Sequence, residues 1–142
     1  QHEVGFFHLG CCAQAAGFGQ EAEAFLARAV DLNPDYLQAI YQLGELYRES
    51  GQLKKAALTF EQCLRRIEEI EQRRRDWNQE ADETLRVAVL NALGLTHRAA
   101  GDDNWARSAW EESLKLDPGQ EGVRAWLDEV RPLYHRTSLT ID

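Results

Sequence analysis

Several residue types are scarce in this chain, and each shortage excludes a class of protein. There is no Met, there are only three Pro and three Cys, and the 16 Lys and Arg are outnumbered by 24 Asp and Glu. The resulting net charge of −8 leaves no basic face that could displace the counterions of a nucleic acid. The same charge disfavours an anionic membrane surface, and no apolar run reaches the roughly 18 residues of a membrane span. We therefore expect binding to neither nucleic acid nor membrane.

The three cysteines do not form the even, spaced set of a disulfide framework. Cys11 and Cys12 are adjacent in sequence, and such neighbours rarely bridge without strain. We expect Cys63 to be reduced as well, which favours a cytoplasmic protein. Because the sequence begins at Gln1 and contains no Met, we also expect it to be an excerpt or a processed form.

An internal repeat organises most of the chain. Four columns share the offsets 34 and 50: a Leu-Gly pair, a single Gly, an Ala and a large apolar residue. Their members are Leu9-Gly10, Leu43-Gly44 and Leu93-Gly94; Gly17, Gly51 and Gly101; Ala22, Ala56 and Ala106; and Leu26, Phe60 and Trp110. The third copy is therefore the same unit, displaced by 16 inserted residues.

Each copy predicts two helices joined by a tight turn. The Gly of the first helix and the Ala of the second allow the helix axes to approach to about 8–10 Å. The single Gly supplies the left-handed conformation that ends the first helix. Asn33-Pro34 and Asp117-Pro118 fit an N-cap followed by Pro at the first helical position, so we expect new helices to start there.

These residues resemble the tetratricopeptide repeat (TPR), a 34-residue unit with the pattern W-x2-L-G-x2-Y, A-x3-F and P. The second copy matches best, with Ile40 in the Trp place followed by Leu43, Gly44, Tyr47, Ala56 and Phe60. Ala13 and His97 replace the Tyr in the first and third copies. The resemblance covers about residues 3 to 120 and implies an all-α, right-handed α-α superhelix of about seven helices.

We expect one TPR domain over residues 1–131. Its parts are repeats at about 3–36, 37–70 and 87–120, an insertion at about 71–86, a capping helix at about 120–131, and beyond it an extended tail at 132–142. The cap follows from one helical stripe ahead of Pro132, formed by Val123, Trp126, Leu127 and Val130. Such a helix covers the last repeat with one face and exposes the other to water.

The insertion contains no Gly or Pro and is rich in helix formers. We expect it to lengthen the two helices that flank it by about 12 Å each, with a turn near Asp76 to Gln79. Apolar residues available to join the two extensions are Ile67, Ile70, Trp77 and Leu85. Two interpretations of its basic run remain open. Arg73, Arg74 and Arg75 either pair with nearby acidic residues or form, with Trp77, a docking knob for a partner.

By the same resemblance, the first helices of the repeats line a concave groove that holds a segment of another protein. The groove residues carried over are Phe7, Cys11 and Gln14; Gln38, Tyr41, Glu45, Arg48 and Glu49; and Asn91, Leu95 and Arg98. An aromatic and apolar wall with a polar rim suits an amphipathic helix or an extended apolar segment. The alternative is that Phe7 and Leu95 pack against neighbouring helices and that Arg48 pairs with a nearby carboxylate.

Family members that capture the acidic C-terminus of Hsp70 or Hsp90 use a clamp of Lys, Asn and Arg residues. The matching positions in this chain are Phe7, Cys11, Gln42, Ala88 and Ala92. Since none of these residues is cationic, we expect the chain not to be a chaperone-tail clamp.

No catalytic or metal-binding pattern accompanies the repeat. His2, His8, His97 and His135 have no H-x3-H or C-x2-C companions, so we expect no metal and no cofactor. Glu45 and Glu49 are one helical turn apart, but without a nucleophile or metal they predict a solvated face. We expect no enzyme within these residues.

Three functions remain open. The leading one is a scaffold or adaptor that binds a peptide or helical segment of a partner in the groove. The second is a regulatory or targeting segment of a longer enzyme. The third is self-assembly into a homo-oligomer, in which the insertion or the tail docks into a neighbouring groove.

Overall fold

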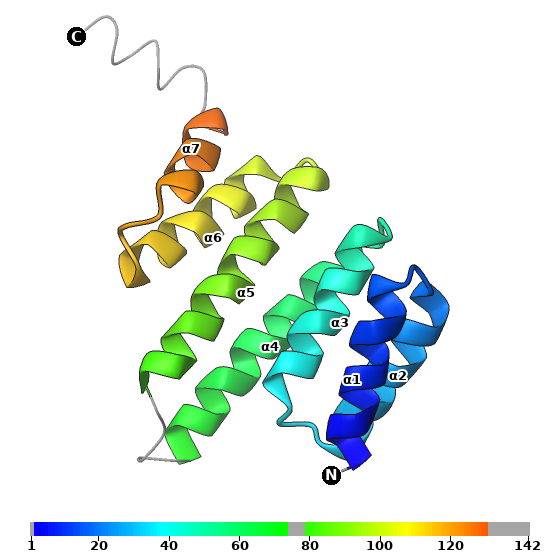
Figure 1. Cartoon of the computed structure of the whole chain (residues 1–142). Coiled ribbons are helices and arrows are strands. Elements are labelled where there is room, and N and C mark those ends of the chain that lie inside the picture. The colour runs from blue at the N-terminus through cyan, green and yellow to red at the C-terminus, as the bar shows by residue number, and fades with distance from the viewer. Residues whose placement is uncertain (1, 74–78, 131–142) are drawn as a thin grey trace, which may run out of the picture.

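The computed structural model describes residues 2–73 and 79–130, except for the side chains of 79–82. This part of the chain forms seven helices: α1 (His2–Ala15), α2 (Gly19–Leu32), α3 (Leu37–Glu49), α4 (Leu53–Arg73), α5 (Gln79–Ala99), α6 (Asp103–Leu116) and α7 (Glu121–Glu129). Helices α1 to α6 pack as three consecutive pairs, and α7 packs on α6 (Figure 1). The expected all-α array of seven helices is confirmed. None of the described helices is long and apolar enough to cross a membrane.

The three hairpins turn in the same way. Gly17, Gly51 and Gly101 have φ angles of 87°, 81° and 87°, in the left-handed region that side chains disfavour. The residue after each Gly returns a hydrogen bond to the last turn of the helix, as when the backbone N–H of Gln52 donates to the carbonyl of Tyr47 at 2.9 Å. The glycine column therefore closes each first helix, as the sequence predicts.

The Leu-Gly column marks the closest approach within each pair. A Cβ atom at Gly44 would lie 2.6 Å from the ring of Phe60, and one at Gly94 would lie 2.1 Å from Nε1 of Trp110. Gly10 meets Leu26 in the same manner. A small residue on one helix and a large one on its partner thus set the distance between them.

Three apolar clusters hold the array together. The N-terminal cluster contains Ala22, Leu26 and Leu46. The central cluster contains Leu37, Ile40, Ala56, Phe60, Cys63, Ile67, Ile70, Val89, Ala92 and Leu93. The C-terminal cluster contains Ala106, Trp110, Val123 and Val130, with the rings of Trp110 and Trp126 5.6 Å apart. Helix α7 therefore buries one face against the third hairpin.

The N-cap expectation for Asn33 and Asp117 is wrong. Asn33 lies at the C-cap of α2, and α3 begins four residues later at Leu37. The side chain of Asn33 instead accepts a hydrogen bond of 3.1 Å from the backbone of Asp35, and that of Asp117 accepts one of 3.3 Å from Gly119. Each residue stabilises the turn that follows the second helix of its hairpin, a second role in which Asn-Pro and Asp-Pro are favoured.

Helices α4 and α5 have 21 residues each, whereas the other helices of the hairpins have 13 or 14. Ile67 and Ile70 belong to the central cluster, Leu85 packs against it, and an ion pair joins Arg86 to Glu71. Arg73 is exposed, with Nη2 3.4 Å from Oδ2 of Asp35. Of the expected turn, Asp76 to Asn78 lie outside the described residues, while Gln79 begins α5. The rest of the docking knob, Arg74, Arg75 and Trp77, also lies outside them, as does the tail at 132–142.

Candidate functional site

The first helices of the three hairpins form one continuous face, called here the inner face. Helix α1 contacts α3, and α3 contacts α5, so that the three lie side by side in Figure 1. On the other side of the array α4 and α6 are separated by clefts. The predicted groove residues are distributed over α1, α3 and α5 and therefore belong to helices of the inner face.

A hydrogen-bonded strip runs along α3. The hydroxyl of Tyr41 donates to Oε1 of Glu45 at 3.0 Å, and Nε of Arg48 donates to Oε2 of the same carboxylate at 3.1 Å. Burial, reinforced by the negative charge of Glu45, raises the pKa of Tyr41 to about 12. The pairing of Arg48 with Glu45 is the alternative that the sequence left open, and it fixes all three side chains in place.

A second set of bonds ties α1 to α3. Nε2 of Gln42 donates to Oε1 of Gln14 at 3.2 Å, and Nε2 of Gln14 donates to Oε1 of Glu49 at 3.2 Å. Gln42 entered the sequence analysis only as a clamp position. Its contact with Gln14 could not be recognised from one repeat, because the two amides belong to different hairpins.

Phe7 and Cys11 on α1 are partly buried. The ring of Phe7 lies 5.1 Å from that of Tyr36 and packs against the N-terminal cluster. Burial raises the pKa of the Cys11 thiol, so a smaller fraction of it is present as the reactive thiolate. Tyr36 is the residue here that the sequence analysis missed, because it lies between helices and belongs to no repeat column.

The three groove residues of α5 contact the capping segment. Leu95 packs against the C-terminal cluster, and Arg98 forms an ion pair with Glu129 of α7. Nδ2 of Asn91 donates to Oε1 of Gln120 at 2.8 Å, and its Oδ1 accepts from Oγ of Ser113 at 2.6 Å. These side chains hold α7 in place, while Gln38 and Glu49 on α3 are exposed.

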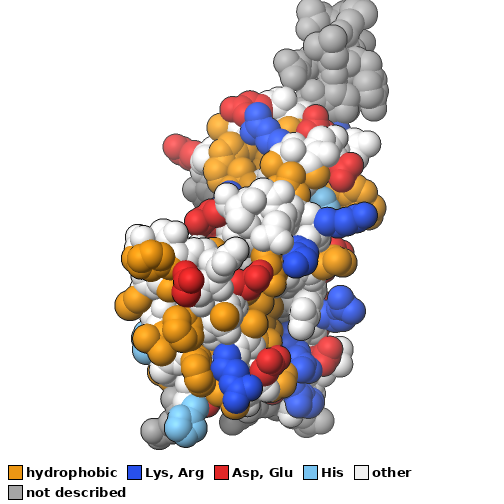
Figure 2. All heavy atoms as spheres, turned by 90° about the vertical axis from the view of Figure 1, so that its right-hand side faces the viewer, with side chains coloured by type: hydrophobic (Ala, Val, Ile, Leu, Met, Phe, Trp, Pro, Cys, Tyr) orange, Lys and Arg blue, Asp and Glu red, His pale blue; other side chains and the backbone are white. Residues whose placement is uncertain are grey.

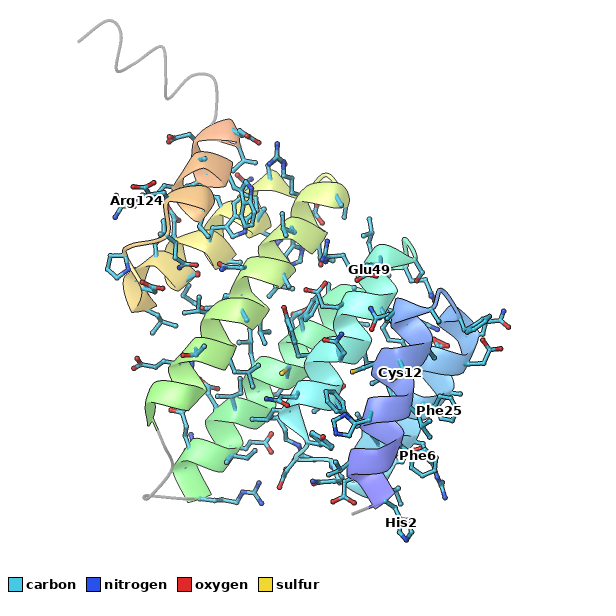
Figure 3. All side chains as sticks on the ribbon, in the orientation of Figure 1. His2, Phe6, Cys12, Phe25, Glu49 and Arg124 are labelled. Carbon is cyan, nitrogen blue, oxygen red and sulfur yellow. The ribbon has the colours of Figure 1, made fainter. Side chains whose placement is uncertain are left out.

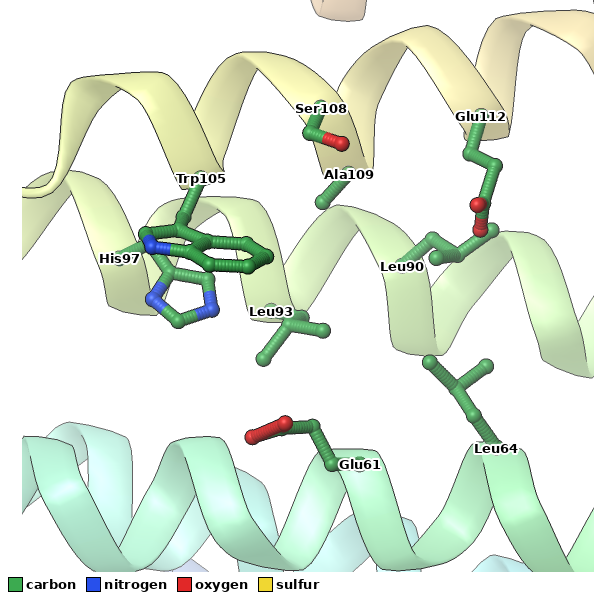
Figure 4. Close-up of a pocket in the computed structure, with 9 residues that line it drawn as sticks. All are labelled: Glu61, Leu64, Leu90, Leu93, His97, Trp105, Ser108, Ala109 and Glu112. Atoms are coloured by element: carbon green, nitrogen blue, oxygen red, sulfur yellow. The ribbon is translucent and has the colours of Figure 1, made fainter.

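The clefts on the opposite, outer face were not foreseen. One of about 160 Å³ lies between α4, α5 and α6, where the ring of Trp105 lies beside that of His97, tilted by 33°, with ring centroids 6.1 Å apart (Figure 4). An adjoining cleft of about 380 Å³ is lined by Ala57, Leu58 and His97 among others. Leu58 and Trp105 are 62% and 66% exposed. The sequence feature that could have indicated these clefts is Trp105, because the other two copies have the charged residues Glu21 and Lys55 at the same repeat position.

Nothing in the described part of the chain resembles a catalytic or metal centre. Within it, no three His, Cys, Asp or Glu side chains are grouped to hold a metal ion. Cys63 is fully buried, and burial raises the pKa of its thiol to about 12.

Comparison with known proteins places this architecture. A family model described as tetratricopeptide repeat matches residues 13–74. A search of curated proteins found no matching sequence. The N-terminal domain of stress-induced protein-1 (STI-1) from C. elegans has 16% identity and a TM-score of 0.77, over 90% of this chain and 93% of that chain.

Two further solved structures are similar over most of the chain. The first TPR of Spaghetti (RPAP3), bound to the HSP90 peptide SRMEEVD, has 14% identity and a TM-score of 0.74, over 92% of this chain and 90% of that one. YrrB, described as a TPR protein with an unusual peptide-binding site, has 16% identity and a TM-score of 0.70, over 91% and 58%. At such identities the likeness shows the fold. The family model identifies residues 13–74 as tetratricopeptide repeat, and the solved structures share the fold over 90–92% of this chain.

Proposed function

We propose that this chain is a non-catalytic scaffold or adaptor, which binds a segment of a partner protein across the inner face of α1 and α3. The hydrogen-bonded strip of Tyr41, Glu45 and Arg48 carries the proposal. The side chains of this strip are already held in one arrangement. Little of their conformational entropy is therefore lost when a ligand binds. Exposed Gln38 and Glu49 flank the strip and offer polar contacts that can set the direction of a bound segment.

The ligand we propose is an amphipathic helix or an extended apolar segment, not an acidic chain terminus. The RPAP3 domain was solved with the peptide SRMEEVD, which carries three acidic side chains, one of them on its last residue. The clamp positions of this chain offer no cation to such a peptide. In addition, Phe7 packs against Tyr36, and Gln42 is hydrogen-bonded to Gln14. Ala88 and Ala92 complete the set without a charge.

Peptide selection from a random display library against the intact chain tests the proposal. We expect selected peptides to lose at least tenfold in affinity when Glu49→Arg or Tyr41→Ala is introduced, with unchanged helical content. Glu111→Arg changes a glutamate on α6 that is also exposed; it is the matched control and should leave affinity unchanged. Peptides that ignore both inner-face changes but lose binding on Trp105→Ala would place the site on the outer face.

The SRMEEVD peptide gives an independent measurement. We expect fluorescence polarisation to detect no binding of this peptide to the chain at concentrations where a clamp-type domain is saturated. Saturable binding that is lost on adding salt would contradict the exclusion of a chaperone-tail ligand.

A further inference from the structure

An exposed tryptophan lines the cleft of about 160 Å³ between α4, α5 and α6 (Figure 4). The side chain of Trp105 is 66% exposed, and the ring of His97 on α5 lies beside it. Trp is among the residues most enriched at the energetic centres of protein interfaces. The indole on the outer face is therefore available as an anchor for another molecule.

The second hairpin shows what occupies these two positions elsewhere in the array. Lys55 and Tyr47 are the counterparts of Trp105 and His97 in the repeat. Nζ of Lys55 lies over the ring of Tyr47, 5.4 Å from its centroid. A cation in this position is attracted by the charge distribution of the ring. The second hairpin thus supplies its own cation to the ring, whereas the third hairpin has a second ring in place of that cation.

Two carboxylates line the same cleft. Glu61 extends from α4 and Glu112 from α6 (Figure 4). Within the described part of the chain, neither side chain makes a hydrogen bond or an ion pair. Lys54 and Arg65 line adjoining clefts, but neither lies within ion-pair distance of these carboxylates. The cleft therefore combines an exposed aromatic ring with negative charge that the described residues do not neutralise.

An apolar cleft of about 380 Å³ adjoins this site and shares Glu61 and His97 with it. Its lining includes Ala57 and Leu58, and Leu58 is 62% exposed. An apolar side chain placed there would be removed from water together with Leu58. A ligand that fills both clefts therefore needs a cation next to an apolar group.

Hydrophobic side chains are also exposed at the α1–α2 end of the array, which faces the viewer in Figure 2. Val4, Leu9 and Phe18 are the large ones among them. Apolar exposure alone does not specify a ligand, whereas two carboxylates beside an indole do. The outer clefts are therefore the surface whose chemistry identifies an occupant.

We propose that the clefts of the outer face bind an arginine of a partner protein, together with an apolar residue next to it in the partner's sequence. Arginine suits the site because its planar guanidinium can stack on the indole of Trp105 while its N–H groups donate to a carboxylate. The net charge of −8 is also complementary to a basic segment. This surface is separate from the inner face, so the chain can hold two segments at once.

NMR titration of the intact, isotope-labelled chain with the peptide acetyl-Leu-Arg-Leu-amide tests the proposal. We expect saturable movement of the indole N–H signal of Trp105 and of the backbone amide signal of Leu58. The same peptide with citrulline in place of arginine has nearly the same shape but no charge. We expect it to bind roughly fivefold more weakly or worse, because it offers no cation to the ring or the carboxylates.

Two variants test the residues that carry the site. Trp105→Ala and Glu61→Gln should each weaken binding of the arginine peptide by roughly threefold or more, measured at the amide of Leu58. Both side chains are exposed, so circular dichroism should show unchanged helical content. Glu111→Gln is the matched control, because it removes the same charge from an exposed glutamate of α6 that lines none of these clefts. This control should leave the affinity unchanged.

Three results would overturn the proposal. The first is an indole signal of Trp105 that does not move up to the solubility limit of the arginine peptide. The second is equal binding of the citrulline and arginine peptides, which would show that no cation is recognised. The third is movement confined to the inner face, for example at Glu49 on α3 (Figure 3), with the affinity unchanged in Trp105→Ala.

Discussion

The hydroxyl of Tyr41 donates a hydrogen bond of 3.0 Å to the carboxylate of Glu45, one turn further along α3. The phenol must be neutral to make this bond, and ionisation would place a second negative charge beside the first. Burial is the larger cause of the raised pKa of Tyr41, and Glu45 is the next. The ordinary value of 10.0 therefore becomes about 12 in the folded chain.

This shift predicts a pH dependence of stability. Because folding favours the neutral phenol, the stabilisation is complete below pH 10.0 and is lost as the pH rises towards 12. We expect Tyr41→Phe to remove the last phenolate step in an ultraviolet titration of the folded chain, and to reduce the loss of stability over that range. Tyr47→Phe is the control that should leave the last step in place. An unchanged final step in Tyr41→Phe would contradict the assignment.

A second prediction concerns the closest helix approach. In Gly94→Ala the new methyl group would lie 2.1 Å from Nε1 of Trp110, a fully buried indole whose N–H donates to the carbonyl of Asn91 at 3.3 Å. We expect the free energy of unfolding in urea to fall by about 1–3 kcal/mol because of overpacking. Gly122→Ala on α7 meets no atom within 4 Å, so the same measurement should change by less than about 1 kcal/mol, towards greater stability. Equal losses in both variants would contradict the packing argument.

The fold could be predicted from the sequence because the repeat encodes distances between helices that adjoin in the chain. Gly44 and Phe60 occur 16 residues apart, as do Gly94 and Trp110, and each pair meets across its own hairpin. The role of Asn33 could not be predicted in the same way. Asn-Pro suits both an N-cap and a turn, and only the start of α3 at Leu37 distinguishes them.

The candidate site was less predictable because its contacts join different hairpins. The family pattern places Asn91, Leu95 and Arg98 on the inner face, yet these side chains contact the capping segment. No column of a single repeat encodes that contact, because the cap follows only the last copy. The contacts of the strip on α3 were easier to predict from the sequence. Glu45 lies one helical turn from Tyr41 and one from Arg48, so the three side chains meet within one helix.

The three thiols give a third prediction, because their burial differs. Cys12 is exposed, Cys11 is partly buried, and Cys63 is fully buried with a pKa raised by burial to about 12. The thiolate is the nucleophile that attacks a thiol reagent, so we expect Cys12 to react first, Cys11 more slowly, and Cys63 only when the chain unfolds. Mass spectrometry of the modified peptides over time measures the order.

Cys12→Ser is the control for this order and should remove the fast phase alone. Rapid modification of Cys63 in the folded chain would mean that α3 and α4 separate readily. That result would contradict the packing of Cys63 in the central cluster, where its Sγ lies 3.7 Å from the carbonyl oxygen of Leu37.

The last prediction concerns the polar network that joins α5, α6 and the capping segment. Asn91 donates to Gln120 and accepts from Ser113, a serine with no exposed surface. Asn91→Ala removes both bonds from a partly buried site, so we expect a loss of about 1–3 kcal/mol in the free energy of unfolding.

We also expect faster hydrogen exchange in α7 of this variant, because the network fixes Gln120 directly before the helix begins at Glu121. Gln38→Ala removes an exposed amide from the inner face of α3 and should change stability by no more than about 0.5 kcal/mol. If α7 exchanged equally fast in both variants, the cap would be held by its apolar face alone. Asn91 would then be free to serve the inner-face site, as the family pattern suggested.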